Sequence, residues 1–134
     1  MVLIDTSAWI EFLRGTGSPA DEQVDRMLAD GSPVATTDVV LMEVLAGARD
    51  EPHRARLRRL LARCEFVAVE GPGDYEQAAA IYRACRRGGE TVRALTDCLI
   101  AQVALRSESE LLHTDADFGA IARHVPLAVR GGGA

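Results

Sequence analysis

Five carboxylates of this chain lie inside or beside apolar segments that should form its core. An acidic side chain in such a place is costly unless it is paired, hydrogen-bonded or bound to a metal ion. Several of them within one small protein predict a single acidic pocket that binds cations. The five residues are Asp5, Glu43, Asp97, Asp115 and Asp117.

The residue types in this group narrow the choice of metal. Carboxylate oxygens without histidine or cysteine favour Mg²⁺ or Mn²⁺ over zinc. His53, His113 and His124 are scattered, and no C-x-x-C pair is present, so the spacing of a zinc site is missing. Two Mg²⁺ ions about 3.5–4 Å apart can activate a water and stabilise the leaving oxygen in phosphodiester cleavage. Chemistry of this kind requires no protein base.

Short apolar segments alternate with helical patterns along the chain, which predicts an α/β fold with a mainly parallel sheet of four to five strands. The expected strands are residues 2–4, 33–36, 66–69, 110–113 and 127–129. The expected helices are residues 6–13, 19–30, 38–48, 52–64, 72–87, 94–106 and 117–124. We expect one domain over residues 1–130 and a flexible glycine-rich tail over residues 131–134.

The order of the strands would decide whether the acids meet. Ligands of open parallel sheets bind beyond the carboxyl ends of the strands. Asp5 ends the first strand, while Asp115 and Asp117 follow the fourth, so neighbouring strands would project all three at one edge. Asp97 lies near the start of a helix that would enter from the same edge. Glu43 lies about a turn and a half into its helix, within reach of the cluster.

Each acid also has a purely structural explanation. Glu43 could simply be solvated, although its neighbours on both sides are apolar. Asp5 could cap the first helix, although Thr6 or Ser7 could do the same. Asp115 or Asp117 could cap the short helix that follows them, with Asp117 the better candidate, just as Asp38 could cap an earlier helix. Asp97 could pair with Arg93, four residues earlier on the same helix face. The matching placement of all five acids favours a functional site over these separate explanations.

Composition fits a globular protein, and the exclusive use of arginine is explained first by a bias in genomic composition. The chain has 134 residues, 48% of them hydrophobic, and a net charge of −5. All basic residues are arginine, and without the five acids the remaining 15 acidic residues would balance 15 basic ones. The acidic pI therefore does not exclude an anionic substrate. No segment reaches the roughly 18 apolar residues of a membrane helix, and Asp5 interrupts any secretory signal, so we expect a cytoplasmic protein.

Four motifs, in order and at suitable spacing, resemble the PIN domain and, within it, the VapC toxins of bacterial toxin–antitoxin pairs. The motifs are residues 3–10, 42–47, 91–101 and 114–118. The resemblance implies a PIN-like three-layer sandwich with helices on both sides of the sheet. It also implies a Mg²⁺-dependent endoribonuclease that cuts RNA needed for translation, with tRNA as the first candidate and rRNA as the second.

The same resemblance implies roles for individual residues and partners. The residues that would hold Mg²⁺, or Mn²⁺ in its place, are Asp5, Glu43, Asp97 and Asp115, with Asp117 as a fifth contributor. Thr6 and Thr114 would orient carboxylates or water. The implied partners are a VapB-type antitoxin, part of which would occupy the active-site groove, an RNA substrate, and a second copy of the chain in a homodimer.

Arginines near the third motif are the candidates for RNA contact, because arginine pairs well with phosphate. They are Arg86, Arg87 and Arg93. A second group on the predicted helix 52–64 is explained equally well by a solvated helix face with local ion pairs. This group consists of Arg54, Arg56, Arg58, Arg59 and Arg63.

Other functions share parts of this pattern. Mg²⁺-dependent phosphatases and phosphotransfer receivers also place acids at strand ends, but they use an essential lysine, and this chain contains none. A DNA nuclease of related fold stays open, because the metal site itself does not read the sugar. A non-catalytic PIN-like binding module would be indicated by the loss of one or more acids, and all five are present.

Overall fold

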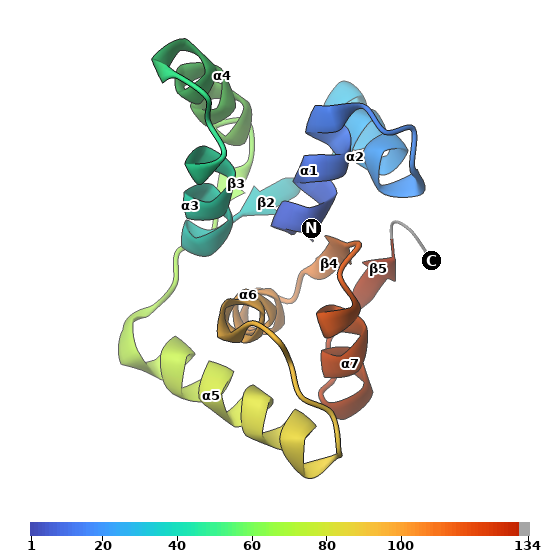
Figure 1. The fold of residues 1–134 in the computed structure, drawn as a ribbon, viewed down its shortest axis with the longest axis vertical. Helices are drawn as coiled ribbons and strands as arrows, with labels where there is room; N and C mark the ends of the chain where they lie inside the picture. The colour runs from blue at the N-terminus through green and yellow to red at the C-terminus, as the bar shows by residue number, and fades with distance from the viewer. Residues whose placement is uncertain (132–134) are drawn as a thin grey trace.

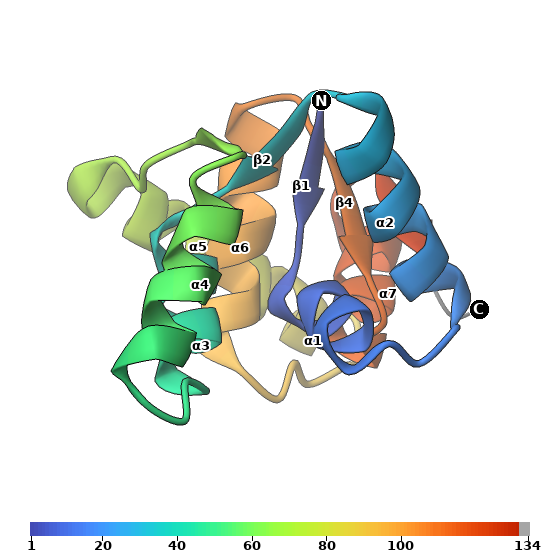
Figure 2. The same ribbon diagram turned by 90° about the horizontal axis from the view of Figure 1, so that it is seen from above.

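A parallel sheet with the strand order β3-β2-β1-β4-β5 forms the central layer of the molecule (Figures 1 and 2). A computed structural model describes residues 1–131. The strands are β1 (Val2–Ile4), β2 (Val34–Thr36), β3 (Glu65–Phe66), β4 (Glu110–His113) and β5 (Val129–Gly131). All four strand pairings are parallel, so the predicted α/β fold with a parallel sheet is confirmed.

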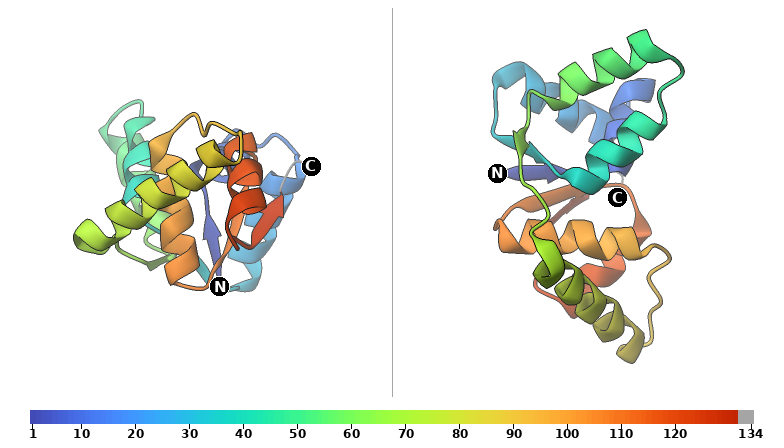
Figure 3. Two further views of the ribbon diagram at one scale, coloured as in Figure 1. Left: turned by 90° about the horizontal axis from the view of Figure 1, so that it is seen from below. Right: turned by 90° about the vertical axis from the view of Figure 1, so that its left-hand side faces the viewer.

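Helices cover both faces of this sheet. They are α1 (Thr6–Arg14), α2 (Pro19–Asp30), α3 (Asp38–Ala46), α4 (Glu51–Leu61), α5 (Gly71–Arg87), α6 (Leu95–Arg106) and α7 (Ala116–His124). Helices α1 to α4 lie on one side, and α5 to α7 lie on the other (Figure 1). Helix α5 crosses the outer side of α6 (Figure 3). Within the described residues, no helix is both long and apolar enough to cross a membrane.

The inner strands β1 and β4 bury apolar side chains because helices cover both faces of the sheet. Every residue of β1 is buried, and Leu111 and Leu112 of β4 are fully buried. Buried apolar segments of this kind are typical of parallel sheets between helical layers. The edge strand β3 is different, since Glu65 and Phe66 are both exposed. The core therefore lies around β1 and β4, directly beneath the acids that follow these strands.

Strands β1 and β4 are neighbours, and their carboxyl ends lie side by side. The prediction that the acids meet at one edge of the sheet depends on this arrangement. Ile4 is paired with Leu112 in the parallel register. One residue further on, the backbone N–H of Asp5 donates to the carbonyl of Leu112 at 2.9 Å. The side chains that follow the two strands therefore leave the sheet at one edge.

The structure decides two of the predicted helix caps. Asp5, one of the three residues that could cap α1, is its cap, and Thr6 and Ser7 are not, since the Asp5 carboxylate accepts from the backbone N–H of Ser7 at 2.9 Å. The predicted cap of α3 by Asp38 is wrong. Thr37 occupies the cap position of α3, and Asp38 lies in the first turn.

Two predicted strands are displaced. The Asp38 carboxylate accepts from the backbone N–H of Val69 at 2.9 Å. Val69 thus bonds to a side chain instead of a neighbouring strand, and β3 includes only Phe66 of the predicted strand 66–69. The last strand begins two residues later than predicted and includes Gly131, the first residue of the expected tail. Residues 132–134 lie outside the described part of the chain.

A buried ion pair fastens α6 to α5. Asp74 is 3% exposed and accepts from Arg106 at 3.0 Å and from Gln102 at 3.2 Å. Burial alone would raise the pKa of Asp74, but these hydrogen bonds and one from the Glu70 backbone lower it below the ordinary value. The pair therefore stabilises the charged carboxylate. Because α6 also carries Asp97, it helps to fix the helix that contributes to the site.

Candidate metal centre

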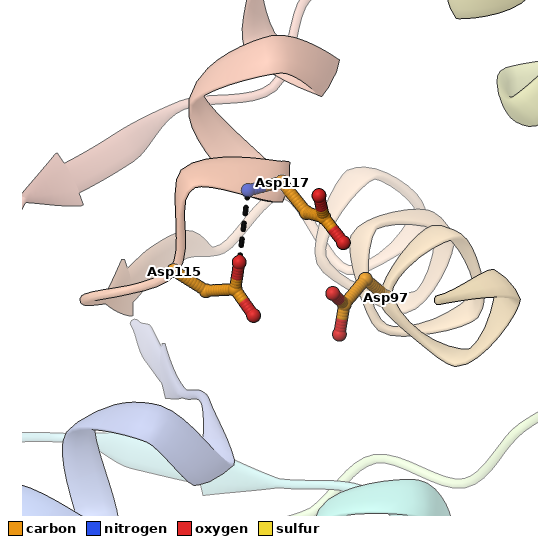
Figure 4. A group of neighbouring side chains, drawn as sticks. All are labelled: Asp97, Asp115 and Asp117. Atoms are coloured by element: carbon orange, nitrogen blue, oxygen red, sulfur yellow. Dashed lines mark hydrogen bonds between the residues drawn. The ribbon is translucent and has the colours of Figure 1, made fainter. Parts of the chain in front are cut away.

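Three of the predicted acids meet beyond the carboxyl end of β4, with their carboxylates turned toward one another (Figure 4). Asp97 belongs to the first turn of α6, Asp115 precedes α7, and Asp117 lies in its first turn. One carboxylate oxygen from each residue lies within 4.8 Å of the other two. The three carboxylates therefore form a group that could hold one metal ion.

Asp5 and Glu43 lie beside this cluster and are electrostatically linked to it. The negative charge of Asp5 helps to raise the pKa of Asp97, and that of Glu43 helps to raise the pKa of Asp5. Asp5 is 3% exposed. Glu43 is partly exposed and accepts a hydrogen bond from the Thr6 hydroxyl at 2.7 Å. Thr6 thus orients a carboxylate of the predicted set.

Burial and mutual repulsion make it unfavourable for all the acids of the site to be ionised at the same time. Burial is the main cause that raises the pKa of Asp97 to about 8, followed by its hydrogen bond with Asp117 and the charges of Asp5, Asp115 and Asp117. Burial also raises the pKa of Asp5 to about 6, although the hydrogen bonds from Ser7 oppose the change. A divalent cation would relieve this repulsion, and an all-oxygen donor set fits Mg²⁺ or Mn²⁺.

Asp115 and Asp117 divide the structural tasks in a way that the sequence did not indicate. Asp115 caps α7, because its Oδ1 accepts from the backbone N–H of Asp117 at 2.9 Å. The prediction of Asp117 as the better cap is wrong. Asp117 instead accepts from the backbone N–H groups of Arg93 at 3.1 Å and Ala94 at 3.3 Å. It therefore anchors the loop of residues 88–94, which leads into α6.

Comparison with known proteins identifies the family. The family model of the PIN domain matches residues 2–124. Ribonuclease VapC11 from Mycobacterium tuberculosis is 46% identical over 124 residues, which cover 92% of each of the two proteins. The chain belongs to the PIN-domain family and, within it, to the VapC ribonucleases. The resemblance found from the four motifs is thus confirmed.

Solved VapBC and VapC structures have the same fold. VapBC2 from Rickettsia felis, bound to a promoter DNA fragment, has a TM-score of 0.76 at 16% identity, with 98% of each chain covered. VapC20 from M. tuberculosis, a toxin that cleaves the sarcin–ricin loop, has a TM-score of 0.67 at 22% identity, with 96% of this chain and 99% of that chain covered. The predicted PIN-like architecture is therefore confirmed.

Ser7 is a part of this PIN-domain site that the sequence prediction missed. Its hydroxyl donates to Asp5 Oδ2 at 2.5 Å and accepts from the backbone N–H of Thr114 at 3.0 Å. It therefore ties the start of α1 to the segment that leads to Asp115. Thr114 takes part through this backbone group, and the residue is exposed. A hydroxyl two residues after a capping aspartate was the available signal for Ser7.

His113 also supports the site without belonging to the predicted set. Its Nδ1 accepts from the backbone N–H of Asp115 at 3.2 Å, which holds the turn after β4. The ring is buried against Phe118, with 5.3 Å between ring centroids. Burial lowers the pKa of His113, so the neutral ring, which can accept this hydrogen bond, is favoured.

Of the three arginine candidates for RNA contact, Arg93 forms ion pairs with the acids of the site. Arg93 lies before α6, so its predicted pairing with Asp97 along one helix face is wrong. Its guanidinium instead pairs with Asp115 and Asp117, in each case at 3.4 Å. Arg86 and Arg87 are exposed in the last turn of α5, where the Arg86 guanidinium lies 5.7 Å from the centre of the Tyr82 ring.

The second arginine group lies on α4 and its C-terminal end. Arg54 forms an ion pair with Glu51 at 2.5 Å, and Arg63 donates to the carbonyl of Leu28 at 2.9 Å. These local contacts favour the structural explanation for two members of the group. Arg56, Arg58 and Arg59 are exposed.

Proposed function

We propose that the protein is a Mg²⁺-dependent endoribonuclease that acts as the toxin of a toxin–antitoxin pair. Its substrate would be RNA needed for translation, with tRNA as the first candidate and rRNA as the second. The observation that carries the proposal is the convergence of Asp97, Asp115 and Asp117 beside Asp5 and Glu43. An enzyme with this substrate would act in the cytoplasm.

The residues of the site would divide the catalytic work. Asp97 and Asp115, with Asp5, Glu43 and Asp117 beside them, would hold the metal at the edge of the sheet. Bound Mg²⁺ would lower the pKa of a water molecule and stabilise the charge that develops on the leaving oxygen. The buried acids would keep their orientation through fixed contacts, such as that of Asp5 with Ser7. Asp115 is the most exposed of the three clustered acids, so it would face the RNA.

We also propose a VapB-type antitoxin as the protein partner. A pocket of about 270 Å³ lies between α1, α3 and α4, and Glu43 forms part of its lining. Ile10, Leu13 and Leu57 supply apolar walls, and Arg49 supplies a positive charge. An antitoxin segment with apolar side chains and an acidic group would fit this pocket and lie next to the catalytic acids.

A homodimer is the third part of the proposal. Tyr75 on α5 is 59% exposed, and Leu95 on α6 is 62% exposed. Both line an apolar pocket of about 210 Å³. Large apolar side chains gathered in this way favour contact with another protein surface, and a second copy of the chain would cover them. Sedimentation of the purified protein, compared with a Leu95→Glu variant, tests this contact.

Cleavage assays test the enzymatic proposal. The purified protein should cut labelled tRNA or an rRNA hairpin only with Mg²⁺ or Mn²⁺ and should leave a 5′-phosphate. Asp97→Asn should abolish cleavage, while Asp25→Asn, which removes the same charge from an exposed position on α2, should retain it. Cleavage that persists in EDTA would contradict the metal mechanism. Equal cleavage of single-stranded DNA would favour the alternative of a DNA nuclease.

A further inference from the structure

One positively charged side chain lies directly against the carboxylate cluster. The Arg93 Nη2 lies 3.4 Å from Asp115 Oδ1, and its Nε lies 3.4 Å from Asp117 Oδ1. Both distances are longer than those of a tight charged hydrogen bond. The Arg93 side chain is also 74% exposed. The guanidinium therefore offsets some of the negative charge of the site but is held weakly.

The backbone beneath this side chain is held more firmly than the side chain itself. The N–H groups of Arg93 and Ala94 donate to Asp117 Oδ2 at 3.1 and 3.3 Å. At the other end of the same loop, Glu90 accepts from His124 at 2.6 Å and also pairs with Arg123. The guanidinium can therefore move by rotation of its own side-chain bonds, without rearrangement of the loop.

We propose that Arg93 is the counterion of the metal-free cluster and that a divalent cation displaces it toward the RNA. A cation held by Asp115 would take over the carboxylate that now pairs with the guanidinium and would repel the positive charge of Arg93. The released guanidinium would then bind a phosphate of the substrate, because its planar fork matches the oxygens of a phosphate group. This inference rests on the proposed function, which identifies the cation as Mg²⁺ and the phosphate as part of an RNA.

Other arginines near the site lack this combination of contacts. Arg123 is paired with Glu90. Within residues 1–131, Arg86 and Arg87 form no ion pair with any of the five acids. Arg93 is thus the arginine that competes with the metal for the same carboxylate oxygens.

If the cation displaces Arg93 toward the RNA, removal of the guanidinium should have opposite effects on Mg²⁺ binding and on RNA binding. Arg93→Met should tighten Mg²⁺ binding to the RNA-free protein by about threefold to fivefold, which corresponds to the loss of an exposed ion pair. The same variant should weaken RNA binding and lower the salt slope by about one phosphate contact. A residue that only supports the loop would weaken both kinds of binding when replaced. Arg87→Met removes an equal charge nearby and should change Mg²⁺ affinity by less than about twofold.

Two measurements test the exchange without relying on catalysis. Calorimetric titration with MgCl₂ gives the metal affinity, and anisotropy of labelled tRNA in Ca²⁺, over a series of salt concentrations, gives the RNA affinity and slope. Arg93→Lys should restore part of the competition with Mg²⁺ and less of the RNA affinity, since lysine lacks the planar fork. Circular dichroism confirms that each variant is folded.

The outcomes separate this inference from the proposed function. A wild-type protein that binds no Mg²⁺ would refute the proposed function. Wild-type Mg²⁺ binding that Arg93→Met leaves unchanged, or changes no more than Arg87→Met does, would overturn the counterion role alone. An unchanged RNA salt slope in Arg93→Met would overturn the phosphate contact.

Discussion

Replacement of Asp97 by asparagine should stabilise the metal-free protein at pH 8. Burial, the hydrogen bond with Asp117 and neighbouring negative charges raise the pKa of Asp97 from 3.8 to about 8. The folded protein therefore binds a proton that the unfolded chain has released between about pH 4 and pH 8. Because the native state binds more protons in this window, its stability falls as the pH rises through it. Asparagine mimics the protonated acid and removes this loss.

The size of the effect follows from the pKa shift. A change from 3.8 to about 8 would amount to about 6 kcal/mol at 1.36 kcal/mol per unit. Two effects reduce this value: solvent at the open edge of the sheet screens the charges of the site, and the neighbouring acids can take up a proton instead of Asp97. We therefore expect Asp97→Asn to raise the free energy of unfolding by about 2 kcal/mol at pH 8. For a domain of this size, the midpoint of thermal unfolding should rise by roughly 8 °C.

Urea unfolding in EDTA at pH 5 and pH 8 measures this difference. The gain should be large at pH 8 and small at pH 5, where wild-type Asp97 is already protonated. Asp25→Asn is the control, because it removes one exposed acid outside the site. At saturating Mg²⁺ the wild type should be more stable than Asp97→Asn, because metal binding stabilises the complete wild-type site more than the altered one. An equal gain at both pH values, or a loss of stability at pH 8, would refute the assignment of the pKa shift to Asp97.

Three further changes probe the contacts around the site. Ser7→Ala, which removes the hydroxyl that holds Asp5, should slow RNA cleavage about tenfold with little change in the unfolding midpoint, and an unchanged rate would contradict a positioning role. Arg106→Met leaves the buried Asp74 without its charged partner and should lower the free energy of unfolding, measured with urea, by about 3 kcal/mol. A decrease of less than about 1 kcal/mol would show that the ion pair contributes little to stability. The apparent Mg²⁺ affinity should tighten as the pH rises from 6 to 8, because Asp97 must release a proton to bind the metal, and calorimetry in buffers of different ionisation enthalpy should detect that proton.

Local sequence patterns were sufficient for most of the fold. The apolar segments at β1 and β4 and the glycines that end α1 and α2 are short-range signals, and the elements formed where they predicted. Errors arose where a contact between distant residues decided the local structure. The short strand β3 is an example, because Asp38 takes up the N–H of Val69, which lies 31 residues away.

The choice of caps at the site was also beyond the reach of local patterns. Asp5 and Ser7 are both good cap residues. Asp5 has the extended backbone of a cap residue, and Ser7 lies in the first turn of α1, where its hydroxyl accepts from the N–H of Thr114, 107 residues further along the chain. The partners of Arg93 depended in the same way on the position of α7, more than 20 residues away.

The sequence by itself determined the chemistry of this protein, because residue type decides which atoms can bind a cation. Asp5, Glu43, Asp97, Asp115 and Asp117 supply carboxylate oxygens, and the positions of these residues relative to apolar segments could be read without a structure. The tertiary structure alone decided how the acids act on one another. The raised pKa of Asp97 and the counterion position of Arg93 depend on burial and on distances between α6, α7 and the end of β1. Such distances arise only when the parallel strands are in register and the helices have packed against them.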